Sequence, residues 1–244
     1  RNSATSRNTA QGICVSTVIP PAFAFHFALP VQRHDRLPLA GKRLLDLSSD
    51  YSIPWPDASL LGSAQVAGPP TANVDLRMAW SERGLGISVT VKGKSNEPTA
   101  NLYEPLASEG LQVWIDTRNT QTIHRASRFC HHFCLIAGGT HETAPEPCVL
   151  QLPIARASED AKQQSPSAFR IERLQHADGY TLEAWLPAAT LTGFDVETCS
   201  QLGFMCWLVD RELGNVSLTV GSEFPFASDP SLWQTLDLVT DKSR

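Results

Sequence analysis

The chain has 244 residues, a formal net charge of −5 and 42% hydrophobic residues, which is enough apolar material for a substantial core. Its Lys and Arg residues form no cluster, so binding to nucleic acid through phosphate neutralisation is disfavoured. No apolar run reaches the ~18 residues of a transmembrane helix, so we expect neither a nucleic-acid nor a membrane partner, and the oligomeric state stays open.

The first residues do not have the sequence pattern of a folded core. Residues 1–21 are rich in Ser, Thr, Asn and Arg, and we expect a disordered tail or the remnant of a targeting segment. We favour a tail that leads into a first strand at 25–29, within a single domain of residues 22–244. The compartment is left open: the cytoplasm is slightly favoured, and secretion follows if residues 1–24 are a signal remnant.

Short runs with period-two alternation follow one another along the chain, as expected of strands that place one face on a core. Two hairpins are predicted, one over 74–80 and 85–91 and the other over 168–174 and 180–186. The remaining predicted elements are strands at 111–116, 128–136, 148–152, 202–209, 216–220 and 235–239, a short helix at 155–164 and one helical turn at 187–191.

The 17 Pro and 15 Gly residues are spread through the chain, as many turns require. The sequence shows no repeat and no long amphipathic helix. We therefore predict the all-β class, with the strands in an antiparallel β-sandwich of jelly-roll type. One strand parity supplies the expected core: Leu111, Val113, Ile115, Leu182, Leu202, Phe204 and Leu208.

The opposite parity places a Trp on the non-core face of three predicted strands. If those strands are neighbours, cross-strand contacts bring the three indoles together. Three interpretations compete for this face: cover by segments such as 22–61 or 140–167, a sugar-binding platform, or a patch for a protein partner. The residues are Trp114, Trp185 and Trp207, with Gln112, Glu183 and His132 as polar neighbours that can contact hydroxyl groups.

The segment 124–134 is unusually dense in His, Cys and Arg. In a strand from 128, one parity faces the core and the other joins the Trp face. A zinc site is one alternative, because side chains two residues apart point the same way and His141 could complete the set. Ligand-free Cys and His on a partly buried face are the preferred interpretation. The residues at issue for a metal are Cys130, His132, Cys134 and His124.

Two further features of this segment bear on its chemistry. In one strand, Cys130 and Cys134 have Cα atoms about 13 Å apart, which exceeds the ~7 Å that a disulfide tolerates. The six Cys residues therefore do not settle the redox compartment. Arg128, with His124 and Arg125, could recognise a carboxylate or phosphate, although ordinary surface charges are the default.

Four segments occur in a fixed order over about residues 72–240. They are Glu109–Asp116, Gly179–Ala184, Leu202–Asp210 and Ser228–Leu238. In this order they resemble the family 9 carbohydrate-binding modules and the wider DOMON-like group of β-sandwiches. The resemblance implies a non-catalytic carbohydrate-binding module, accessory to polysaccharide metabolism, with a carbohydrate as its partner.

The resemblance also bears on individual positions. In sugar-binding members two loop Trp residues clamp the sugar, and those positions align near Leu106 and Ala227, with Phe226 adjacent. Neither aligned residue is aromatic. A ligand-contacting polar position matches Gln112, and an Arg-bearing position falls near His132. Strand parity and the 124–134 segment supply the other candidates, so the expected ligand site is Trp114, Trp185, Trp207, Gln112, Glu183, His132 and Arg128.

Few features of the sequence support a catalytic function. Asp116, Glu183 and Asp210 are available to a glycosidase, but no pairing of carboxylates is marked and no hydrolase or phosphate-loop motif occurs. We expect no catalytic residue and no cofactor. Calcium at 116–119, zinc as above and haem through Met205 are weaker alternatives. A metal-dependent or hydrolytic enzyme domain and a protein-interaction sandwich without a sugar ligand remain the competing classes.

Overall fold

The computed structural model describes residues 27–41, 43–54, 73–139 and 144–240. The predicted tail at 1–21 lies outside the described residues. Within them, no helix is long and apolar enough to cross a membrane. The strands are β1 (Ala28–Arg33), β2 (Val74–Ser81), β3 (Gly84–Lys92), β4 (Gly110–Asp116), β5 (Cys130–Ile136), β6 (Cys148–Leu152), β7 (Arg170–His176), β8 (Gly179–Pro187), β9 (Gln201–Val209), β10 (Val216–Ser217) and β11 (Gln234–Val239).

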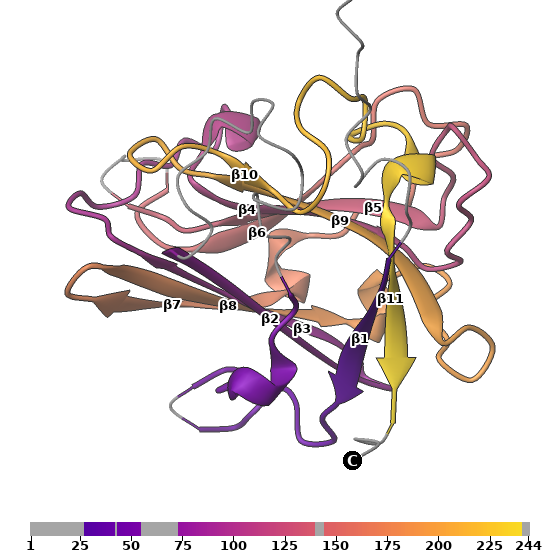
Figure 1. Ribbon diagram of the computed structural model, residues 1–244, viewed down its shortest axis with the longest axis horizontal. Helices are drawn as coiled ribbons and strands as arrows, with labels where there is room; N and C mark the ends of the chain where they lie inside the picture. Colours follow the sequence, from indigo (N-terminus) through magenta and orange to yellow (C-terminus); the bar gives the residue numbers. More distant parts are fainter. Residues whose placement is uncertain (1–26, 42, 55–72, 140–143, 241–244) are drawn as a thin grey trace, which may run out of the picture.

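The strands form one sheet that folds over on itself to make two layers. Its order is β6-β5-β4-β9-β11-β1-β2-β3-β8-β7, and β10 pairs with β9. In Figure 1, β4, β5, β6, β9 and β10 make the upper layer, β2, β3, β7 and β8 make the lower layer, and β1 and β11 run steeply beside both. The fold class is all-β and sandwich-like, as predicted.

One part of the predicted topology is wrong, because the sheet is mixed and not wholly antiparallel. β1 pairs in parallel with both β11 and β2. A parallel pair needs a crossover connection of a dozen or more residues, and the long segment between Arg33 and Val74 provides one. Pro30 is tolerated in β1 because pairing with β2 starts only at Gln32, which leaves the first half of the strand paired on one side.

The space between the two layers is filled by the residues that alternation assigns to the core. All seven predicted core residues are buried there, from Leu111 in β4 to Leu208 in β9. The inward residues of β3 and β8, Leu182 among them, come from the lower layer, and these two strands pair residue for residue in an antiparallel register. At about 25 cal/mol per Å² of apolar surface, this continuous cluster is the main stabilising element of the fold. The inward residues of β3 and β8 are Leu85, Ile87, Val89, Val91, Tyr180, Leu182, Ala184 and Leu186.

Both predicted hairpins form, as β2–β3 and β7–β8, and the helical turn appears as the 3-10 helix η5 (Ala188–Thr190). The helix expected at 155–164 does not form, and turns and extended chain take its place. So short a segment gains too little from helix propagation to offset nucleation. The strand expected at 216–220 is limited to β10. The strand β1 begins at Ala28, and residues 25 and 26 of the expected first strand lie outside the described residues.

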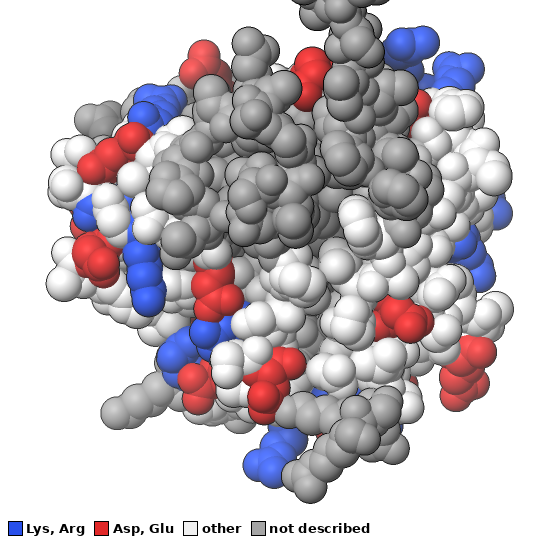
Figure 2. All heavy atoms as spheres, viewed as in Figure 1, with Lys and Arg blue, Asp and Glu red and all other residues white. Residues whose placement is uncertain are grey.

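The charged side chains are interspersed on the surface. Figure 2 shows Lys and Arg beside Asp and Glu on the visible face, with both signs present around its rim. Several of these contacts are ion pairs, such as Arg33 with Glu82 at 2.8 Å and Arg128 with Glu159 at 3.5 Å. Pairs this exposed contribute little to stability, typically about 0–1 kcal/mol, so the core and buried polar groups dominate.

Candidate ligand-binding site

A hollow opens on the outer face of the upper layer, on the side of β4, β5 and β9 away from the core. Strand register builds its floor: Trp114 in β4 lies directly opposite His132 in β5, and Gln112 lies opposite Trp207 in β9. All four have the parity opposite to the core residues of their strands, as alternation predicts. The sheet therefore gathers two of the three predicted Trp residues with two of their predicted polar neighbours.

Aromatic rings form one wall of the hollow. The Trp114 and His132 rings are stacked, with centroids 4.2 Å apart and planes inclined by 12°. Phe226 packs edge-on against Trp114 at 5.3 Å and stacks on Trp207 at 5.4 Å. Such geometries add about 0.5–1.5 kcal/mol per pair beyond area burial. Trp114 and Phe226 are buried as a result, while Trp207 stays half-buried and presents part of its indole to the hollow.

The polar edge of the hollow is held in one orientation. Gln112 donates from Nε2 to the carbonyl of Leu106 at 3.0 Å, and its Oε1 lies 3.3 Å from Nε2 of His132. Burial lowers the pKa of His132 to about 3, because the charged imidazolium loses its hydration there. His132 is therefore neutral at physiological pH and can donate from Nε2 to Gln112.

One donor at this site has no partner. Trp114 is 2% exposed, and its indole Nε1 makes no hydrogen bond to the part of the chain that the structure describes. A buried donor without an acceptor costs about 1–3 kcal/mol, and such groups in native structures call for an explanation. The nitrogen is also closed to solvent, so a ligand in the hollow does not reach it in this conformation.

The hollow has a volume of about 440 Å³, within the range of pockets that hold small molecules. Its rim is apolar and comes from three loops. Leu106, 57% exposed, belongs to the 3-10 helix η3 (Pro105–Ala107). The lining residues are Leu106, Gln112, Trp114, His132, Leu152, Pro153, Ala155, Trp207, Ser222, Phe224, Pro225, Phe226 and Ala227.

The expectation that all three Trp residues share one surface is wrong. Trp185 lies in β8, which pairs with β3 and β7 in the lower layer. Leu37, Leu44, Leu45 and Leu47 cover it from outside, and it is 3% exposed. The chain between β1 and β2 therefore acts as the covering segment on the lower layer, which is the first of the three interpretations given above.

Glu183 lies on the same covered face and not in the hollow. Its carboxylate is fully buried and forms an ion pair with Arg43. It also accepts from the backbone N–H groups of Leu45 at 2.9 Å and Asp46 at 3.3 Å. Glu183 therefore fixes the covering segment to the sheet, and its side chain has no free face for a ligand.

The remaining sequence candidates are dispersed. Arg128 is exposed in the turn before β5, where its guanidinium lies over the Phe129 ring at 5.0 Å and pairs with Glu159. His124 is exposed beside Asp229 at 3.2 Å. Neither contributes to the hollow, so the expectation that Arg128 lies at the Trp face is wrong. The reason is that the strand begins at Cys130, two residues later than predicted.

The metal candidates do not converge. Cys134 Sγ lies 3.9 Å from His132 Nε2, but Cys130 packs in the main core and His124 lies elsewhere on the surface. Burial raises the pKa of Cys130 and of Cys134 to about 12, which favours the thiol over the metal-binding thiolate. No group of three or more His, Cys, Asp or Glu suited to a metal occurs in the described segments.

The carboxylates named for a glycosidase also lie apart. Burial raises the pKa of Asp116, against the opposing effect of hydrogen bonds from its own turn. Its two oxygens accept from the backbone N–H groups of Arg118 at 2.9 Å and Thr120 at 2.6 Å. The turn at 116–119, named as a calcium candidate, is thus closed by its own amides. Asp210 and Glu183 sit in separate buried ion pairs.

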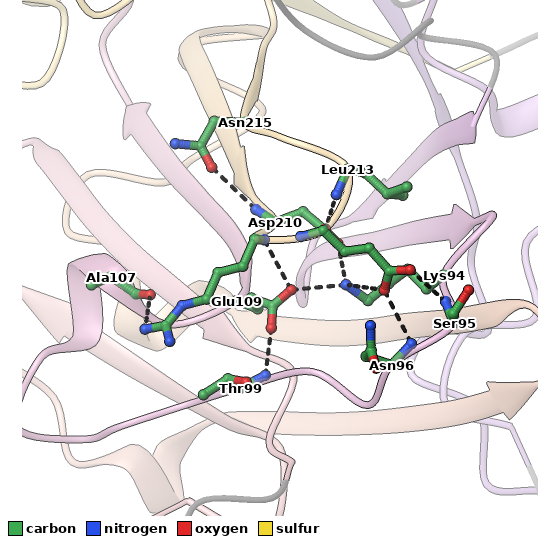
Figure 3. A network of polar contacts seen from close by, with 11 residues as sticks. Lys94, Ser95, Asn96, Thr99, Ala107, Glu109, Asp210, Leu213 and Asn215 are labelled. Carbon is green, nitrogen blue, oxygen red and sulfur yellow. Dashed lines mark hydrogen bonds and ion pairs between the residues drawn. The ribbon is translucent and has the colours of Figure 1, made fainter.

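Sequence reasoning missed a buried polar network that lies where β4 begins and β9 ends. Lys94 Nζ lies 2.8 Å from Glu109 and 2.7 Å from Asp210, and all three side chains are at most 3% exposed. Figure 3 shows these groups with the backbone amides that satisfy the remaining oxygens. Glu109 and Asp210 are 15 and 116 residues away from Lys94 in the chain, so no local sequence pattern predicts these contacts.

No protein-family model matches this chain, and no curated protein sequence matches it either. Among solved structures, it is similar to a family 9 carbohydrate-binding module from Caldicellulosiruptor kristjanssonii in complex with cellotriose. The TM-score is 0.57 at 12% identity, over 89% of this chain and 96% of that chain. The module of the same family and organism in complex with glucose gives 0.52 at 12% identity, over 88% and 98%. The predicted resemblance in fold is confirmed.

Proposed function

We propose that this protein is a carbohydrate-binding module and that the hollow on β4, β5 and β9 is its ligand site. The observation that carries the proposal is the meeting of Trp114, Trp207 and Phe226 with a neutral, oriented pair, Gln112 and His132. Sugars present an apolar C–H face and a ring of hydroxyl groups. They suit a pocket that combines aromatic area with a few fixed polar groups.

Each residue has a distinct part in this proposal. The half-buried indole of Trp207 supplies the surface on which a pyranose ring stacks, and Phe226 holds that indole in place. Trp114, 2% exposed and stacked on His132, forms the rigid floor beneath the ligand. Gln112 and His132, already bonded to each other and to Leu106, need little further ordering when a ligand binds.

A non-catalytic role fits the chemistry of the site. Among the described residues that line the hollow there is no Asp or Glu, whereas glycoside hydrolysis needs two carboxylates placed across the scissile bond. The solved modules with a similar fold carry cellotriose and glucose, which supports neutral glucosides as the first ligands to test. A role accessory to polysaccharide metabolism follows as part of the same proposal.

Calorimetric titration with glucose and cellotriose, after a glycan array, tests the proposal. We expect Trp207→Ala to weaken binding by about tenfold or more, roughly 1.4 kcal/mol. Trp185→Phe is the matched control, because Trp185 lies in the other layer and Phe retains most of its apolar volume. That control should bind as the wild type does. A wild type that binds no glycan, or a Trp207→Ala variant with unchanged affinity, contradicts the proposal.

The pH dependence gives a second test. The pKa of His132 is lowered to about 3, so its protonation state does not change between about pH 5 and pH 8. Affinity should therefore be constant over this range. A fall in affinity centred near pH 6.5 would mean that an exposed, titrating imidazole contacts the ligand, and the neutral-pair argument would fail.

A further inference from the structure

A second hollow adjoins the first on the outer face of the upper layer. It has a volume of about 460 Å³ and lies where β9 ends and the following turn begins. Leu106 and Trp207 line both hollows, so the two are separated only by these side chains. Val209 continues the same face of β9 two residues beyond Trp207 and lines the second hollow. A ligand that stacks on Trp207 can therefore extend across it.

The chemistry of the second hollow differs from that of the first. The first hollow is mainly apolar and its described lining contains no Lys, Arg, Asp or Glu, whereas the second is lined by a guanidinium, a carboxamide and the carboxylate of Asp210. Arg211 is exposed and uses Nη2 to donate to the carbonyl of Ala107 at 3.3 Å. Asn215 uses its Oδ1 to accept from the backbone N–H of Asp210 at 3.2 Å (Figure 3). These contacts orient both side chains and leave other donors of Arg211 and Asn215 for a ligand.

The lining carboxylate does not cancel this donor character. Asp210 accepts from the backbone N–H groups of Glu212 at 2.9 Å and Leu213 at 2.7 Å through one oxygen. Its other oxygen binds Lys94 at 2.7 Å. Glu212, for its part, is engaged by backbone N–H groups of residues 95 and 96 and does not line this hollow. Donors and one cation are therefore what the hollow presents.

We propose that the ligand is an acidic oligosaccharide that spans both hollows. A neutral sugar unit stacks on Trp207 in the first, and a uronic-acid unit places its carboxylate against Arg211 and Asn215 in the second. The planar guanidinium matches a carboxylate with paired, charge-assisted hydrogen bonds. This inference rests on the proposed carbohydrate function and adds the class of sugar and the residues that select it.

The test uses two disaccharides that differ only at one carbon. Cellobiose is neutral, and in cellobiouronic acid a glucuronic acid replaces the non-reducing glucose. At an ionic strength of about 0.02 M, we expect cellobiouronic acid to bind about threefold to fivefold more tightly, as fits an exposed charge pair. The preference should shrink at about 0.5 M salt, where screening acts over a few Å.

Arg211→Gln is the test variant. The Gln side-chain amide can still donate to the carbonyl of Ala107, while the positive charge is lost. It should bind both disaccharides with equal affinity. Arg125→Gln is the matched control: Arg125 is also exposed and also donates to a backbone carbonyl, that of Arg156 at 3.1 Å, and it lines neither hollow. It should keep the wild-type preference.

The possible results separate the two proposals. Binding of cellobiose without preference for the acidic partner, or a preference that survives Arg211→Gln, overturns this inference and leaves the carbohydrate function standing. Failure of the wild type to bind either disaccharide or any glycan on the array overturns both.

Discussion

Replacing Lys94 by Met tests the energetic weight of the buried network shown in Figure 3. The ammonium lies 2.8 Å from Glu109 and 2.7 Å from Asp210. Met keeps most of the apolar stem and removes only the charge. At an effective dielectric constant of about 20, each contact at about 2.8 Å is worth roughly 6 kcal/mol of Coulomb attraction. The desolvation of three buried ions, several kcal/mol for each, opposes that attraction.

In the variant the attraction disappears while two carboxylates stay buried. We therefore expect a loss of about 3–5 kcal/mol in the free energy of unfolding, the usual cost of removing one partner from a buried pair. Chemical denaturation followed by tryptophan fluorescence measures it. Lys92→Met is the matched control, because Lys92 is exposed two residues earlier, and it should change stability by no more than about 0.5 kcal/mol.

The effect should also depend on pH in a defined direction. Burial by itself lowers the pKa of Lys94, but the hydrogen bonds that its ammonium donates to Asp210 and Glu109 outweigh this and hold the pKa above its ordinary value. In the wild type, the stabilisation from Lys94 is therefore fully present below about pH 10 and is lost only as the pH rises through the raised pKa. The deficit of Lys94→Met should therefore narrow as the pH rises above about 10, because the wild type then loses the same charge. A variant as stable as the wild type at pH 8 would refute the reasoning.

Two further substitutions probe other parts of the fold. Arg43→Met removes the cation that pairs with fully buried Glu183. We expect the free energy of unfolding, measured by chemical denaturation, to fall by about 1.5–3 kcal/mol. Sugar binding should not change, because this ion pair lies in the other layer. Gly110→Ala should destabilise the protein by more than about 2 kcal/mol, since Gly110 has φ of +144° and an added Cβ would lie 2.1 Å from the carbonyl oxygen of Leu135. Gly41→Ala, where an added Cβ meets nothing within 4 Å, is its control, and equal melting temperatures for the two variants would contradict the argument.

Alternation within each strand was enough to predict which side chains face the core. The period-two geometry ties every residue of a strand to one face, so a few apolar residues such as Leu111 and Phe204 determine the orientation of all their neighbours. The same rule placed Trp114, Trp207, Gln112 and His132 on the outer face. The order of the strand motifs predicted the all-β class and the resemblance in fold.

What covers an outer face, and which strands lie side by side, was decided only by the tertiary structure. Trp185 and Trp207 each lie on the side of their strand that faces away from the core. However, β8 pairs in the lower layer and β9 in the upper layer. Strand pairing depends on contacts between residues far apart in the chain, and the energy of a pair resides in packing and not in local propensity. The network of Lys94 could not be predicted from the sequence for the same reason, because its partner Asp210 is 116 residues away. The sequence therefore determined the faces of the strands, and long-range packing selected which of those faces became a site.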